Sequence, residues 1–108
     1  MPKTQTETKK EIAVALSPEC KYCKAEILIL EAFKKKYPNL DIKLVWYGTG
    51  NSLPNTTLPV LLGKPEDKSK IKKFPTFFFV FPDGKTIGGE GFIDGKNLEE
   101  FCKKINFL

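Results

Sequence analysis

The sequence contains no histidine, and all of its 18 basic residues are lysines, so arginine is absent as well. Without histidine, neither a Ser-His-Asp nor a Cys-His nucleophile can be built, and zinc sites that use histidine are unavailable. Sites that bind nucleic acid favour arginine, because its planar guanidinium makes bidentate contacts with bases and phosphates. We therefore interpret the net charge of +5 as a solvated lysine surface and expect no nucleic-acid partner.

Long apolar runs are absent too. No stretch reaches the ~18 apolar residues that a membrane-spanning helix needs, so we expect no membrane partner. Residues 1–10, MPKTQTETKK, are polar and lack the apolar core of a signal peptide, which predicts a disordered N-terminal tail and a cytoplasmic protein. Residues 11–108 have the length of a single domain, and we expect that domain to be a monomer.

The three cysteines are too few, and odd in number, for a disulfide-stabilised scaffold. In a reducing compartment, a pair of cysteines is more often catalytic or metal-bound than structural. Cys20 and Cys23 form such a pair. Cys102 falls with Leu98 on the apolar face of a helix predicted near the end of the chain, so we predict that it packs in the core as a small hydrophobic residue.

Hydrophobic patterning predicts strands and helices that alternate along the chain. Residues 47–73 are the least legible: a short helix is expected to start near Pro65, and no state can be assigned to 58–62. A βαβ unit followed by a ββα unit predicts an α/β fold with a four-stranded mixed sheet flanked by helices. The predicted elements are a strand at 11–16, a helix from about Cys20 to Tyr37, a strand at 40–46, a central strand at 76–81 covered on both faces, the turn and second strand of a hairpin at 82–92, and a helix capped by Asp94.

Cys20-Lys21-Tyr22-Cys23 lies where the first predicted strand ends and the first predicted helix begins. Two cysteines three residues apart at a helix start can bring their sulfur atoms together. The unpaired N–H groups of the helix N-terminus favour the Cys20 thiolate, and Lys21 and Lys24 add positive potential, whereas Glu19 opposes it. We therefore expect Cys20 to be the exposed nucleophile and Cys23 to be the thiol that resolves the mixed disulfide.

Three alternatives to this interpretation stay open. A closed zinc site needs four ligands, and Cys20, Cys23 and Cys102 supply three, so a carboxylate or a second chain would have to complete it. The domain could also be a binding module without enzymatic activity. Finally, the cysteine pair could have no role.

Three stretches in order resemble proteins of the thioredoxin-like superfamily, in character between thioredoxins and glutaredoxins. The first is the strand, the CxxC pair and the helix just described. The second is Phe74-Pro75-Thr76 followed by an apolar strand, which is similar to the cis-proline loop of that family. The third is Gly91-Phe92-Ile93 before the last helix, sixteen residues after Pro75. Together they cover most of residues 11–108.

The resemblance implies a thiol–disulfide oxidoreductase with a thioredoxin fold. Cys20 would attack the substrate disulfide and Cys23 would resolve the mixed disulfide. Pro75 would be cis and face the pair, with Phe74 and Thr76 offering backbone groups to an extended substrate. No cofactor beyond the redox-active disulfide is expected; the partners would be protein disulfides and either a reductase or glutathione as electron donor.

Two residues of these motifs have competing interpretations. Tyr22 is either an exposed spacer or a contact for substrate or glutathione. Pro59, in Thr57-Leu58-Pro59-Val60, competes for the cis position, because glutaredoxins carry a similar Thr-Val-Pro. The strand, turn and glycine that follow Pro75 in the family's order favour Pro75.

The chain also departs from the thioredoxin pattern. Thioredoxins have a buried aspartate six residues before the first cysteine, where this sequence has Val14. The proton of Cys23 would therefore have to be managed by Glu26 or by water. Residues 47–73 are longer than in compact relatives, which indicates either an insertion specific to a partner or a plain loop.

Overall fold

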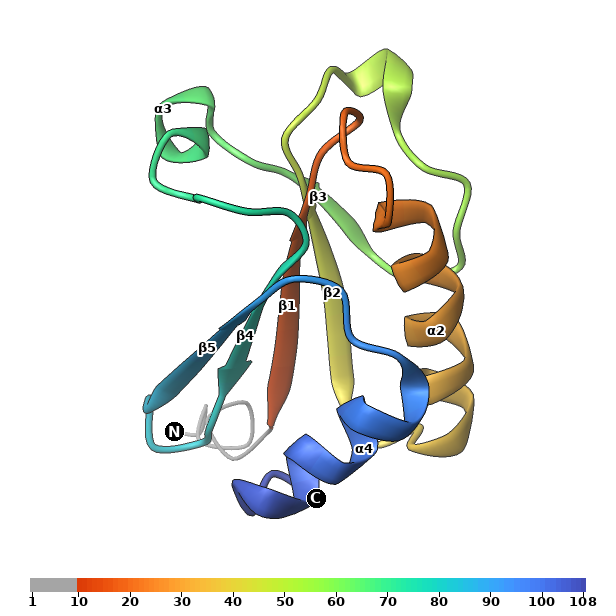
Figure 1. The fold of residues 1–108 in the computed structure, drawn as a ribbon, viewed down its shortest axis with the longest axis vertical. Coiled ribbons are helices and arrows are strands. Elements are labelled where there is room, and N and C mark those ends of the chain that lie inside the picture. The colour runs from red at the N-terminus through yellow and green to blue at the C-terminus, as the bar shows by residue number, and fades with distance from the viewer. Residues whose placement is uncertain (1–9) are drawn as a thin grey trace, which may run out of the picture.

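The strands of this protein are β1 (Glu11–Leu16), β2 (Asp41–Trp46), β3 (Val60–Leu62), β4 (Thr76–Val80) and β5 (Thr86–Glu90), described over residues 10–108 in a computed structural model (Figure 1). They form one sheet in the order β3-β2-β1-β4-β5. β2 is parallel to β1 and to β3, whereas β4 is antiparallel to both of its neighbours. The predicted mixed sheet is therefore confirmed.

The sheet has five strands rather than the predicted four. The additional strand is β3, from the segment to which no state was assigned. It has three residues, and Val60 pairs with Leu44 while Leu62 pairs with Trp46. A run of three residues is too short to show an alternation of apolar and polar residues. Only its pairing with β2 therefore defines this strand.

Residues 1–9 of the predicted tail lie outside the described residues. Lys10, which the prediction included in the tail, already pairs with the sheet, because its carbonyl oxygen accepts a hydrogen bond from the Asp41 N–H at 3.2 Å. The sheet pairing thus starts one residue before the predicted domain boundary.

Two helices pack against the sheet and on each other: α2 (Cys23–Lys36) and α4 (Gly95–Lys104). α3 (Pro65–Lys68) is one turn long and lies apart from them (Figure 1), and it begins at the predicted proline. Asp94 caps α4 as predicted, since its carboxylate accepts the Asn97 N–H at 2.9 Å. No helix within residues 10–108 is long and apolar enough to cross a membrane.

The predicted start of the first helix is wrong by three residues. α2 begins at Cys23, and the carbonyl of Tyr22 accepts its first hydrogen bond, from the Glu26 N–H at 2.9 Å. Cys20 lies in the turn before the helix, where its own N–H donates to the Ser17 carbonyl at 3.1 Å. Helix propensity cannot separate this turn from the helix, because the turn residues also occur in helices.

The core lies between the sheet and the pair α2 and α4. Alternate strand residues point into it, as the period of two requires. In β4, Phe77 and Phe79 are fully buried, whereas Phe78 and Val80 are only partly buried. The prediction that this strand is covered on both faces is therefore wrong for one face, because both long helices pack on the Phe77 side. Cys102 is fully buried in the same core, as predicted.

The register of β4 brings the three sequence motifs to one end of the sheet. Thr76 pairs with Ala15 near the end of β1, and on its other side with Glu90 at the end of β5. Pro75 therefore lies beside the strand end that leads to the cysteines, and its carbonyl accepts the Gly91 N–H at 2.8 Å. The turn before α2, the loop after β2 and the loop entering β4 occupy this end of the sheet (upper part of Figure 1).

Candidate functional site

The two cysteines before and at the start of α2 differ in accessibility. Cys20 is partly exposed, whereas Cys23 is 3% exposed and belongs to the core. Their side chains are close enough to hydrogen-bond to one another. The predicted pair is therefore brought together, with Cys20 as its accessible member.

Burial is the main reason that the pKa of the Cys23 thiol is raised to about 12. The hydrogen bond with Cys20 and the nearby Glu26 carboxylate raise this pKa further, and a backbone hydrogen bond from Ser17 lowers it. Cys23 therefore holds its proton at neutral pH. A reaction that needs the Cys23 thiolate also needs a group that accepts this proton.

Glu26 lies one helical turn after Cys23 and is completely buried. Its Oε1 accepts the Ile93 N–H at 2.8 Å, while its Oε2 makes no hydrogen bond within the described residues. Burial raises the pKa of this carboxyl to about 7; the negative Asp94 adds to the rise and the Ile93 hydrogen bond opposes it. A carboxyl that can gain or lose a proton near neutral pH thus stands beside Cys23.

The Phe74–Pro75 peptide bond is the one cis bond among residues 10–108, so Pro59 follows a trans bond. Pro75 is buried, and the Phe74 ring lies against the Tyr47 ring with 5.9 Å between centroids. The Thr76 hydroxyl is turned inward and donates to the Lys73 carbonyl. What this loop can offer to a bound peptide is therefore mainly backbone.

Tyr22 forms an exposed aromatic pair with Phe92. The two side chains are 56% and 41% exposed, and their ring centroids are 5.6 Å apart. Tyr22 was a predicted contact for substrate, whereas Phe92 was predicted only as part of the Gly91-Phe92-Ile93 motif. Its position directly after Gly91, whose φ of +96° suits glycine, is the signal that could have identified it.

Glu19, which was expected to oppose the positive potential of Lys21 and Lys24, has contacts of its own with Ser17 and Lys68. It accepts a hydrogen bond from the Ser17 hydroxyl and pairs with Lys68 of α3 at 3.3 Å, and these contacts lower its pKa. Within residues 10–108, Lys21 and Lys24 form no ion pair. Their influence on the Cys20 thiolate stays a prediction.

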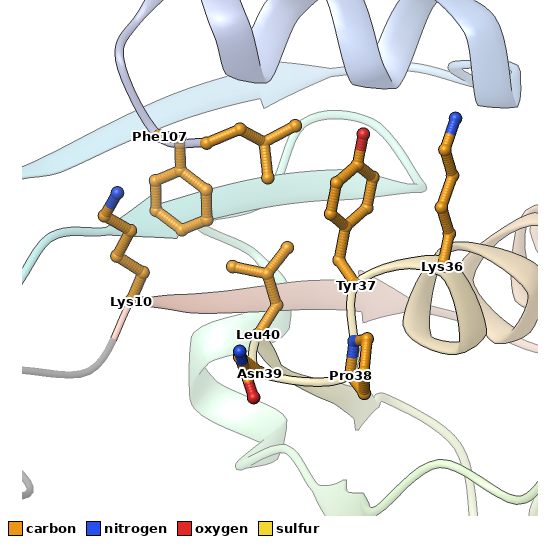
Figure 2. Close-up of a pocket in the computed structure, with 8 residues that line it drawn as sticks. Lys10, Lys36, Tyr37, Pro38, Asn39, Leu40 and Phe107 are labelled. Atoms are coloured by element: carbon orange, nitrogen blue, oxygen red, sulfur yellow. The ribbon is translucent and has the colours of Figure 1, made fainter.

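A hollow of about 460 Å³ lies at the other end of the sheet. Figure 2 shows Tyr37, Leu40 and Phe107 around it, with Lys10 and Lys36 on either side. No cysteine lines it, and Lys36 is already paired with Glu99 at 2.9 Å. We assign no function to this hollow.

The alternative of a metal site receives no geometric support from the described part of the chain. Within residues 10–108, no group of three or more cysteine, aspartate or glutamate side chains is placed so that it could hold a metal ion. Cys102 belongs to α4 and is buried in the core, so no third cysteine joins Cys20 and Cys23 in such a group.

No protein-family model and no curated protein matches the sequence. Solved structures do match the fold. The exposed lipoprotein thioredoxin Etrx1 of Streptococcus pneumoniae has a TM-score of 0.74 and 18% identity, over 94% of this chain and 88% of that one. A secreted disulfide oxidoreductase of Mycobacterium tuberculosis has a TM-score of 0.69 and 17% identity, over 94% and 83%. StoA of Bacillus subtilis has 0.63 and 24%, over 87% and 82%.

These structures show that this chain has their fold. They also give no support to the predicted cytoplasmic location. One of them is an exposed lipoprotein and another is secreted.

The buried Glu26 carboxyl predicts a stability that depends on pH. Folding raises its pKa from 4.5 to about 7, so the folded state binds more protons between these values and stability falls as pH rises through them. The fully ionised carboxylate costs roughly 3 kcal/mol, since one pH unit corresponds to about 1.4 kcal/mol. We expect Glu26→Gln to raise the free energy of unfolding by roughly 2–3 kcal/mol at about pH 8, and to change it little at about pH 4.5.

Urea denaturation of wild type and variant at both pH values measures this difference, and other titrating groups cancel in it. The control is Glu100→Gln, which removes an exposed carboxylate from α4 and should shift stability by less than about 0.5 kcal/mol. A Glu26→Gln effect that is equal at both pH values would contradict the prediction.

Proposed function

We propose that this chain, which has the thioredoxin fold, is a thiol–disulfide oxidoreductase that works through Cys20 and Cys23. The observation that carries the proposal is the pair itself. An accessible thiol and a buried one lie close together where a strand meets a helix, at the end of the sheet that also carries the cis Pro75 loop. The similar structures include proteins described as disulfide oxidoreductases, which supports the same chemistry here.

The reaction begins at Cys20. Its thiolate attacks one sulfur of the substrate disulfide, forms a mixed disulfide and releases the other sulfur as a thiolate that takes up a proton. Cys23 then loses its proton, attacks the Cys20 sulfur and releases the second substrate thiol. The substrate gains two electrons, and the protein keeps a Cys20–Cys23 disulfide.

The proton of Cys23 has a nearby acceptor in Glu26. Only the ionised carboxylate can take up this proton. A carboxyl with a pKa raised to about 7 is a stronger base than an exposed carboxyl, yet it is still partly ionised at neutral pH. Val14 leaves no carboxylate on β1 at the place where thioredoxins have an aspartate. Glu26 therefore takes that role from the helix side.

The substrate backbone would lie along Phe74–Thr76, and its side chains would reach the Tyr22–Phe92 pair. Exposed aromatic rings give a large apolar contact at a small entropic cost. The proposed partners are protein disulfides, with electrons supplied by a reductase or by glutathione. No bound cofactor takes part in these steps.

Substitution of each cysteine tests the exchange mechanism. We expect Cys20→Ser to lower the dithiothreitol-driven reduction of insulin by at least ~100-fold, because a serine hydroxyl does not attack a disulfide at neutral pH. Cys23→Ser should instead accumulate a mixed disulfide with the substrate, visible by mass spectrometry. Cys102→Ala is the control for loss of a thiol and should keep the activity, provided that circular dichroism shows it folded.

If Cys20→Ser keeps the insulin-reducing activity, the proposed oxidoreductase mechanism is contradicted and the binding module is the alternative that remains. Stoichiometric zinc that is lost with Cys20 and Cys23 would instead support the metal site.

The role of Glu26 can be read from the second chemical step. In single-turnover experiments, we expect release of the substrate thiol from the mixed disulfide to depend on pH with an inflection near 7, the pKa of Glu26. Glu26→Gln should remove this inflection and slow the step by about 100-fold or more, the usual scale for a positioned acid or base. If the inflection persists in Glu26→Gln, water and not Glu26 accepts the proton.

The aromatic pair predicts an effect on substrate binding. Phe92→Ala should raise KM for a protein disulfide by about five- to tenfold, because aromatic contacts of this kind contribute about 1 kcal/mol beyond their buried area. Leu108→Ala is the matched control, since Leu108 is 36% exposed and lines the hollow at the other end of the sheet. A KM that is unchanged by Phe92→Ala and by Tyr22→Ala would show that substrates do not use this surface.

A further inference from the structure

A pocket of about 500 Å³ opens beside the cysteine pair. One wall is the start of α2 with the turn before it, and the other is the loop after β2, residues 52–55. Cys20 and Cys23 both line it, whereas the Pro75 loop and Phe92 do not. Its volume falls in the range of ~300–1,000 Å³ that is typical of sites for small molecules. It is therefore a second surface at the reactive thiols, separate from the one proposed for peptide substrates.

The pocket has an apolar floor and a wall that is tied in place. Ile27 and Trp46 are 5% and 6% exposed and form the floor, and Leu53 stands at the rim with 48% exposure. The Trp46 Nε1 donates to the Ser52 hydroxyl at 3.1 Å, which holds the start of the loop. Further along, the Thr56 hydroxyl donates to Glu31 of α2 at 2.5 Å. These bonds fasten the loop at both ends, so the pocket is preformed.

The charged part of the lining has one sign. Lys21 and Lys24 both line the pocket, are exposed, and form no ion pair within residues 10–108. The neighbouring carboxylates are engaged elsewhere: Glu19 by Lys68, and Glu31 by the Thr56 hydroxyl. Cations above an apolar floor favour a ligand with an apolar body and a negative charge.

We propose that this pocket binds small disulfides that carry carboxylates and presents them to Cys20. The inference rests on the proposed function and names a substrate class for it. The Cys20 thiolate attacks one sulfur of the bound disulfide RSSR, forming the Cys20–SR mixed disulfide and releasing RS⁻. The Cys23 thiolate then displaces the second RS⁻. In sum, two protein thiols and RSSR give the Cys20–Cys23 disulfide and two RSH, so the protein dithiol is the reductant and RSSR is the oxidant.

Two aromatic disulfides of similar size separate charge from reactivity. 5,5′-Dithiobis(2-nitrobenzoate) carries carboxylates, and 4,4′-dithiodipyridine is neutral at pH 8. Stopped-flow absorbance of the released thiol gives the rate of each with the reduced protein. We use the ratio of the anionic rate to the neutral rate, because any change in Cys20 reactivity cancels in it.

The double variant K21Q/K24Q should lower this ratio by about tenfold. The control K35Q/K104Q removes two exposed lysines outside the pocket and lowers the net charge equally. Its ratio should stay within about twofold of wild type, so long-range attraction is separated from the pocket.

A second pair of variants tests the place of binding. Leu53→Asp puts a carboxylate at the rim and should lower the ratio by about tenfold. Leu61→Asp makes the same change at a leucine of similar exposure, 50% against 48%, on β3 outside the pocket, and should change the ratio less than twofold.

The outcomes distinguish the two proposals. If neither disulfide oxidises Cys20 and Cys23, the proposed oxidoreductase function is wrong. If both react but K21Q/K24Q and K35Q/K104Q change the ratio equally, or Leu53→Asp leaves it unchanged, the pocket proposal is overturned and the oxidoreductase stands.

Discussion

The pairing of β4 between β1 and β5 is the constraint on which the site depends. Its register places Thr76 opposite Ala15 and opposite Glu90, so the cis Pro75 loop, the turn before α2 and Gly91 all meet at one end of the sheet. The buried rings of Phe77 and Phe79 hold this register, because a slip by one residue would turn them away from the core. The packing of these two rings in the middle of the sheet therefore fixes the positions of the site loops at its end.

The same arrangement makes the two cysteines unequal. Cys20 precedes the helix and stays accessible, whereas Cys23 is the first residue of α2 and is drawn into the core with it. Burial of Glu26 one turn later lowers stability at neutral pH but keeps a carboxyl of raised pKa beside the buried thiol. Its hydrogen bond to Ile93 also joins α2 to the loop that carries Phe92. One buried side chain therefore connects the reactive helix with the surface proposed for substrates.

Local pattern predicted most elements because their signals are contained in short stretches. The alternation in 40–46, the apolar run at 76–81, Pro65 and the cap Asp94 each specify an element through their neighbours alone. β3 and the first residue of α2 were not predicted, since the former exists only through pairing with β2 and the latter only through the turn at Cys20. Phe92 was missed for a similar reason: nothing local indicates that its ring lies against Tyr22.

By itself, the sequence determined the chemical inventory: two cysteines three residues apart before a helix, no histidine to serve as a base, and lysine as the only basic residue. The tertiary structure decided which thiol is accessible, that Glu26 is buried beside the other, and that Lys21 and Lys24 border a pocket made with a loop some thirty residues away. Burial and electrostatic environment arise from contacts between distant segments. Residue types can be read one position at a time, but their reactivity is set only when those segments meet.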